Sequence, residues 1–133
     1  MPFVLDASVV ITWAMRDEDH PLADLAFQKM QTDSAVVPAI WWYEVRNILV
    51  INERRNRISR DDSTQFLSDL SAFAIELRPP ENSQFTIDLA RQHHLSVYDA
   101  AYLTLAIQQK VPIATLDEAL QSAAASMKVP LLA

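Results

Sequence analysis

The sequence contains no cysteine and no glycine. Without cysteine, disulfide bonds and thiolate metal sites are excluded, and a reducing compartment is the natural setting. Without glycine, helix ends that favour a left-handed residue must use another residue type. His94 and Lys110 stand where such ends are expected, and histidine tolerates a positive φ better than most residues. We therefore interpret the pair His93-His94 as chain-turning or surface residues and not as metal ligands.

Targeting and membrane-spanning segments are also missing. The N-terminus shows no basic segment followed by an apolar one, so no secretory signal is predicted. The most apolar stretch, residues 39–51, is interrupted by Glu44, Arg46 and Asn47 and is too short to cross a bilayer. We expect a soluble, cytoplasmic protein with no membrane partner. Its 133 residues suit one domain over 1–133, large enough to bury roughly two thirds of its unfolded surface.

Positive charge is scarce, since the net charge is −6. This argues against a nucleic-acid partner, because phosphate binding usually leaves a basic footprint. Bound divalent cations would offset that objection where a phosphate must sit. Five of the eight arginines also lie within residues 46–60. A solvated helix end and a patch that contacts phosphate or a partner explain this cluster equally well.

Short apolar segments alternate with longer helical patterns along the chain. The predicted strands are 3–5, 35–37, 74–77 and 113–115, with a possible edge strand at 129–132. The predicted helices are 8–16, 20–32, 39–57, 59–72, 81–93, 97–109 and 117–126. This alternation is typical of an α/β fold with a parallel sheet and helices on both faces.

Acidic residues follow two of these strands. Asp6 comes directly after 3–5, and Asp117 follows 113–115 by one residue. Sites in open α/β sheets form at the carboxyl ends of the strands, so both side chains should project into one rim. Asp99 in the first turn of 97–109 and Glu44 early in 39–57 also lie near helix starts.

Helix capping is a second explanation for the three aspartates. Asp6 and Asp117 would each cap the helix that follows, or Thr115 would cap in place of Asp117. Asp99 stands three residues after Ser96, which is the spacing of a capping-box variant. Taken singly, each aspartate leaves both interpretations open.

Helix capping does not explain Glu44. On a helical wheel it falls on the same stripe as Ile40, Ile48 and Ile51, which we expect to face the core. A lone buried carboxylate is costly. A metal ion, an arginine or a hydrogen-bonded pocket would account for it, and Asn47, one turn on, could orient a neighbour or a water.

We call Asp6, Glu44, Asp99 and Asp117 the four acids. If the fold brings them together they need protons or a cation, because two unit charges 4 Å apart repel by roughly 4 kcal/mol at an effective dielectric near 20. Purely oxygen ligands suit Mg²⁺ or Mn²⁺ rather than zinc. One or two such ions can activate water for displacement at phosphorus. Ser8 and Thr115, each two residues from a strand-end aspartate, could hydrogen-bond the acids or a phosphate oxygen.

Four short motifs occur in a familiar order and spacing. They are VLDAS at 4–8, WWYEVRN at 41–47, LSVYDAAY at 95–102 and ATLD at 114–117. With them the sequence resembles PIN-domain proteins over essentially its whole length, and most of all the VapC-type toxins of bacterial toxin–antitoxin pairs. No single motif is specific, but the set of four is.

The resemblance implies a three-layer α/β/α fold with a central parallel sheet of four to five strands. It also implies a Mg²⁺- or Mn²⁺-dependent endoribonuclease that forms a homodimer and is inhibited by a VapB-type antitoxin. The family's catalytic acids correspond to the four acids, with Asp6 and Asp99 as the main direct metal ligands. Glu44 and Asp117 would hold its waters or a second ion, and Ser8 and Thr115 correspond to the family's hydroxyls. His94 and Lys110 depart from positions that are often glycine, which affects helix ends and not the acids.

Other interpretations remain. A phosphoacceptor or phosphatase domain would also collect acids at strand ends. It normally has paired acids directly after the first strand and a lysine directly after a late strand, and neither is present here. A catalytically inactive PIN-like module that binds a protein or RNA would keep the fold.

The helix at 39–57 is apolar on more than one face, with Trp42, Val45, Leu49 and Val50 away from Glu44. A dimer interface and burial by a helical hairpin explain this equally well.

Overall fold

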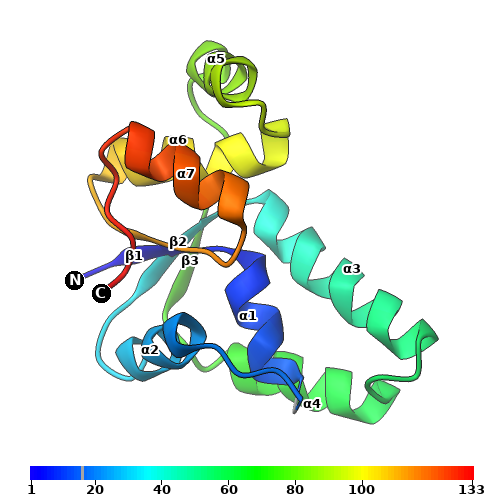
Figure 1. Cartoon of the computed structure of the whole chain (residues 1–133). Coiled ribbons are helices and arrows are strands. Elements are labelled where there is room, and N and C mark those ends of the chain that lie inside the picture. The colour runs from blue at the N-terminus through cyan, green and yellow to red at the C-terminus, as the bar shows by residue number, and fades with distance from the viewer. Residues whose placement is uncertain (16) are drawn as a thin grey trace.

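A parallel four-stranded sheet lies at the centre of the computed structural model, which describes residues 1–15 and 17–133 (Figure 1). The strands are β1 (Phe3–Leu5), β2 (Ala35–Pro38), β3 (Ile75–Arg78) and β4 (Ile113–Ala114), in the spatial order β3-β2-β1-β4. β1 pairs with β2 through Phe3 and Ala35, and with β4 through Leu5 and Ala114. The two inner strands are fully buried, as expected for strands covered on both faces.

Helices form the outer layers. They are α1 (Ala7–Ala14), α2 (Pro21–Lys29), α3 (Ile40–Arg54), α4 (Arg60–Leu70), α5 (Ser83–His93), α6 (Val97–Gln109) and α7 (Glu118–Ser126). In Figure 1, α6 and α7 cover one face of the sheet, and α1 and α2 cover the other. α3 begins at the carboxyl end of β2 and extends away from the sheet, and α4 runs back below α1 towards β3. The predicted three-layer α/β/α architecture with a parallel sheet is therefore confirmed.

Element boundaries differ from the predictions in a few places. Pro38, predicted to stop the second strand, is its last residue and pairs with Arg78. The helix predicted over 39–57 ends at Arg54. The possible strand at 129–132 contributes a single bridge between Ile113 and Leu131. The last residue of the helix predicted over 8–16 lies outside the described residues.

The left-handed helix ends are made without glycine. His94 ends α5 at φ 54° and Lys110 ends α6 at φ 56°, as the sequence predicted for both. His93 is instead the last helical residue of α5. In the part of the chain described, no helix is long and apolar enough to span a membrane.

Candidate active site

Asp6 occupies the end of β1, where its backbone N–H donates to Ala114 O at 3.0 Å. It is the N-cap residue of α1, but its side chain makes no capping bond, so the capping interpretation is wrong here. The carboxylate is 6% exposed and its Oδ2 accepts from Ser8 Oγ and from Thr115 Oγ1, each at 2.7 Å. The predicted hydrogen bonds of both hydroxyls to an acid are thus confirmed at Asp6.

Both hydroxyls are also acceptors from the chain around β4. Leu116 N–H donates to Ser8 Oγ at 3.0 Å, and Asp117 N–H donates to Thr115 Oγ1 at 3.1 Å. Each hydroxyl accepts one backbone N–H and therefore directs its own proton at Asp6. The β1–α1 and β4–α7 junctions, more than a hundred residues apart in sequence, are joined through this one carboxylate.

Asp117 serves as the N-cap of α7. Its Oδ1 accepts from Leu120 N–H at 3.0 Å, which confirms the capping interpretation and excludes Thr115 as the cap. Capping uses one carboxylate oxygen of a group that needs several partners. Asp117 therefore caps a helix and also stands at the same rim as Asp6, because β1 and β4 are paired.

Glu44 lies at the edge of the core and not inside it. The fully buried stripe of α3 consists of Trp41, Val45, Leu49 and Asn52, whereas Glu44 is half-buried. The prediction that its stripe faces the core is therefore wrong by about a quarter turn. Its Oε1 accepts a hydrogen bond from the hydroxyl of Tyr102 on α6 at 2.5 Å.

Asp99 projects from the first turn of α6. Ser96 Oγ accepts from Asp99 N–H at 3.0 Å, so the predicted cap of this helix is confirmed. The half-buried carboxylate stands one helical turn before Tyr102. Residues three apart on a helix share a face, so α6 directs Asp99 and Tyr102 towards the same region.

The pKa shifts show that the four acids share one electrostatic field. Burial is the main cause that raises the pKa of Asp6, and the charge of Asp117 raises it further, while Thr115 and Ser8 oppose the rise. Burial likewise raises the pKa of Glu44, with smaller contributions from the charges of Asp6 and Asp99. The pKa of Asp99 is raised by burial and then by Asp117 and Asp6. Carboxylates whose charges raise a neighbour's pKa in this way lie within electrostatic reach of it.

The rim is open rather than closed around an ion. Across residues 1–15 and 17–133, none of the four acids forms an ion pair, and no three acidic or histidine side chains are arranged closely enough to hold a metal ion. The donor chemistry nevertheless suits a hard divalent cation, because the groups are carboxylates with supporting hydroxyls. A cation would offset the repulsion that the described residues leave uncompensated.

Tyr102 makes a contact that the sequence analysis did not predict. It belongs to the motif at 95–102, but its partner Glu44 lies 58 residues away. The available signal was its position three residues after Asp99, which places both on one face of α6.

Two of the five arginines in residues 46–60 contact other side chains of this chain. Arg57 pairs with Asp17 at 3.2 Å and with Glu18 at 3.3 Å. The Arg46 guanidinium lies 3.8 Å from the centre of the Trp42 ring. These two arginines therefore have local structural partners.

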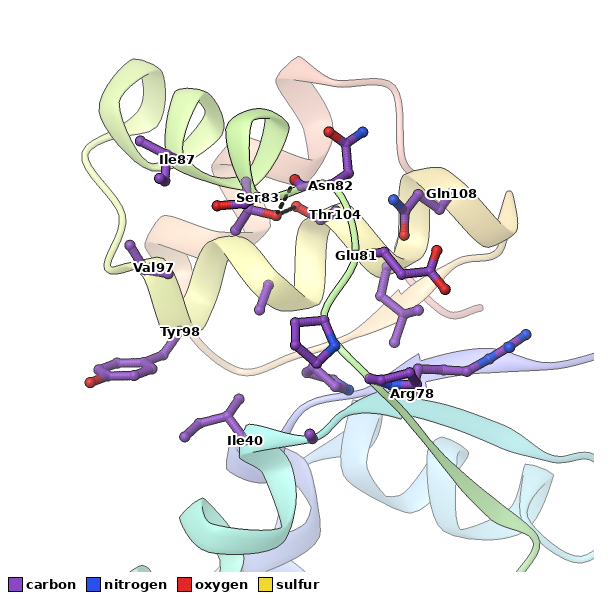
Figure 2. Close-up of a pocket in the computed structure, with 17 residues that line it drawn as sticks. Ile40, Arg78, Glu81, Asn82, Ser83, Ile87, Val97, Tyr98, Thr104 and Gln108 are labelled. Atoms are coloured by element: carbon purple, nitrogen blue, oxygen red, sulfur yellow. Dashed lines mark hydrogen bonds between the residues drawn. The ribbon is translucent and has the colours of Figure 1, made fainter.

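An apolar groove of about 740 Å³ lies between α5, α6 and the start of α3 (Figure 2). Ile87, Val97 and Ile40 face it, and a hydrogen bond of 2.9 Å between Thr86 and Thr104 joins the two helices along it. None of the four acids lines this groove. The acidic rim and the groove are separate features of neighbouring elements.

Comparison with known proteins defines the class of this chain. The PIN domain family matches residues 3–126, and the chain therefore belongs to that family. It is of the VapC type: it is 31% identical over 123 residues to a protein named Ribonuclease VapC3 from Pyrobaculum aerophilum, which covers 90% of this chain and 92% of the relative. The crystal structure of PAE2754 from the same organism has the same fold, with a TM-score of 0.71 at 18% identity over 92% of this chain and 79% of that one.

Proposed function

We propose that this protein is a divalent-metal-dependent endoribonuclease and the toxin of a toxin–antitoxin pair, with residues 1–133 acting as one domain. The observation that carries the proposal is the buried Asp6 carboxylate, which is oriented by two hydroxyls and lies within the electrostatic reach of three further acids. Membership of the VapC-type PIN family, and the relative named a ribonuclease, support the choice of RNA as substrate.

Asp6 and Asp99 would hold Mg²⁺ or Mn²⁺, with Glu44 and Asp117 on the outer side of the site. When bound, the ion supplies Lewis-acid activation of water and stabilises charge at the phosphate. Ser8 and Thr115 are committed to Asp6, because each accepts a backbone N–H and donates to the same oxygen Oδ2. They therefore orient this carboxylate without using its second oxygen, which favours a supporting role over direct contact with phosphate.

The test is an Asp6→Asn protein assayed on total RNA with Mg²⁺ or Mn²⁺. The substitution removes the charge while keeping the shape, so cleavage should fall by at least about 100-fold, as expected when metal ligation or its support is lost. Asp33→Asn is a matched control, because Asp33 pairs with the N-terminal amine away from the acids. Undiminished cleavage by Asp6→Asn would contradict the assignment.

A catalytically inactive module would be recognised by calorimetry, since it should show no divalent binding that depends on the four acids.

We further propose a cytoplasmic homodimer with a VapB-type antitoxin partner. Trp42 and Val50 are exposed on α3 and are available to a partner, whereas Val45 and Leu49 are buried in the core. An antitoxin that presents a lysine or arginine to the rim would replace the cation by charge.

A further inference from the structure

Tyr102 is a fully buried side chain, 0% exposed, with a polar end. A buried phenol hydroxyl needs a hydrogen-bond partner, and here it donates to Glu44 Oε1 at 2.5 Å. Hydrogen bonds to an ionised group are short and strong. The contact therefore anchors one oxygen of an acid that we place in the active site.

The bond joins two elements that present acids to the same rim. Tyr102 and Asp99 lie one turn apart on α6, and Glu44 lies near the start of α3. In Figure 1, α3 extends away from the sheet from that start. A glutamate on such a helix has three rotatable side-chain bonds, so its carboxylate needs a tether to keep one position. The hydroxyl of Tyr102 provides that tether from the helix that carries Asp99.

The two oxygens of Glu44 have different surroundings. Oε1 accepts from Tyr102, and no other hydrogen bond to this carboxylate is formed by the part of the chain that is described. Oε2 is thus available on a half-buried group that lies within electrostatic reach of Asp6 and Asp99, whose charges act on Glu44. The tyrosine fixes the direction in which that free oxygen points.

We propose that Tyr102 is a positioning residue that orients the Glu44 carboxylate for divalent-ion binding and RNA cleavage. This inference rests on the proposed function. The competing explanation is that Glu44 only satisfies the hydroxyl of a core tyrosine, in which case the bond would matter for stability and not for the site.

The experiment compares Tyr102→Phe with the unmodified chain. This change removes one hydroxyl and keeps the ring, so the core stays filled. Four quantities are measured: the Kd for Mn²⁺ by calorimetry, the melting temperature in EDTA, and kcat and KM on an RNA substrate. We expect Mn²⁺ affinity and kcat to fall about 10- to 100-fold, the range seen when an outer support of a metal ligand is lost. KM should change little, because Tyr102 is too buried to touch RNA.

Tyr98→Phe is the matched control. It removes the same hydroxyl one turn away on the same helix, from a side chain that is 58% exposed, and it should leave all four quantities unchanged. Glu44→Gln then completes a double-mutant cycle, which isolates the coupling between two residues in contact. If Tyr102 acts through Glu44, adding Tyr102→Phe to Glu44→Gln should cause no further loss of affinity or kcat.

Each outcome separates the two proposals. Changes of less than twofold in Mn²⁺ affinity and kcat for Tyr102→Phe, full additivity in the cycle, or a collapse of folding without a metal-specific effect would each overturn the positioning role. In those cases the nuclease assignment would stand. If the unmodified protein neither binds Mn²⁺ nor cleaves RNA, the proposed function itself fails, and the positioning role fails with it.

Discussion

At the scale of single residues, hydroxyl groups decide how the acids are held. Burial raises the pKa of Asp6, and the hydrogen bonds from Thr115 and Ser8 oppose that rise. Thr115 is 0% exposed, and its oxygen also accepts from Asp117 N–H. The residue thus supports one acid directly and the backbone of a second.

Thr115→Val should lower both stability and activity. Valine fills the same volume but leaves the half-buried backbone N–H of Asp117 without its partner and removes a donor from Asp6. We therefore expect a loss of about 1–3 kcal/mol in the free energy of unfolding. Urea denaturation measures this loss, and cleavage of RNA should fall in parallel.

Thr12→Val is the control for this change. Thr12 is also buried, but its hydroxyl bonds to Val9 O within α1 and touches none of the four acids. Its substitution should spare cleavage. Equal losses of activity for the two variants, compared at equal folded fraction, would argue against a special role for Thr115.

At the scale of elements, the helices end without glycine at a cost in backbone strain. Five residues in the described chain have positive φ, and all are asparagine, histidine or lysine: Asn56, Asn82, His94, Lys110 and Lys128. Asparagine and histidine tolerate this region better than lysine. Lys110, which ends α6 at φ 56° and ψ 48°, is therefore a clear site of strain.

Lys110→Gly should stabilise the fold. Glycine adopts the left-handed conformation without the Cβ penalty, so we expect a gain of roughly 0.5–1 kcal/mol after the larger entropy of the unfolded chain is counted. Thermal unfolding followed by circular dichroism measures it. Gln109→Gly, at the last helical residue of α6, should instead destabilise by up to about 1 kcal/mol, the cost of glycine in a helix interior. A destabilising Lys110→Gly would show that the lysine side chain makes a compensating contribution.

At the scale of the whole molecule, the parallel sheet brings together charges that the chain keeps far apart. The pKa values of Asp6, Glu44 and Asp99 are all raised in the folded state. The folded protein therefore holds on to protons that the unfolded chain has already released, and stability is lost as the pH rises from the ordinary carboxyl range through the raised values. At a pH above the raised pKa values, the full cost of ionising these groups is present.

Mg²⁺ or Mn²⁺ should remove part of that cost. We expect the melting temperature in EDTA to fall as the pH rises above the ordinary carboxyl range, because the pKa values of Asp6, Glu44 and Asp99 are raised in the folded state. Carboxylates elsewhere in the chain should reduce the size of this effect. Millimolar Mg²⁺ at pH 7 should raise it, because the ion binds the folded state only. Differential scanning calorimetry with and without Mg²⁺ provides the measurement. If Mg²⁺ changes the melting temperature of neither the unmodified protein nor its Asp99→Asn variant, this would count against a metal site formed by the four acids.

Several features could be predicted from the order of residues because they depend on local chemistry. The alternation of strands and helices defined the α/β fold, the strand ends located Asp6 and Asp117, and Ser96 marked the start of α6. His94 and Lys110 were found as left-handed ends because a glycine-free chain must place some other residue there.

The tertiary structure decided what depends on packing between distant segments. A helical wheel shows which residues of α3 share a face but not which face is buried. The sequence therefore predicted Glu44 to face the core, whereas Trp41 and Val45 occupy it. The hydrogen bond from Tyr102 to Glu44 likewise depends on packing between distant helices. Sequence alone determined the kinds of groups and the strand ends that carry them. Only folding determined that Tyr102 donates to Glu44 and Thr115 to Asp6, because these partners are 58 and 109 residues apart and come together only when the distant segments pack.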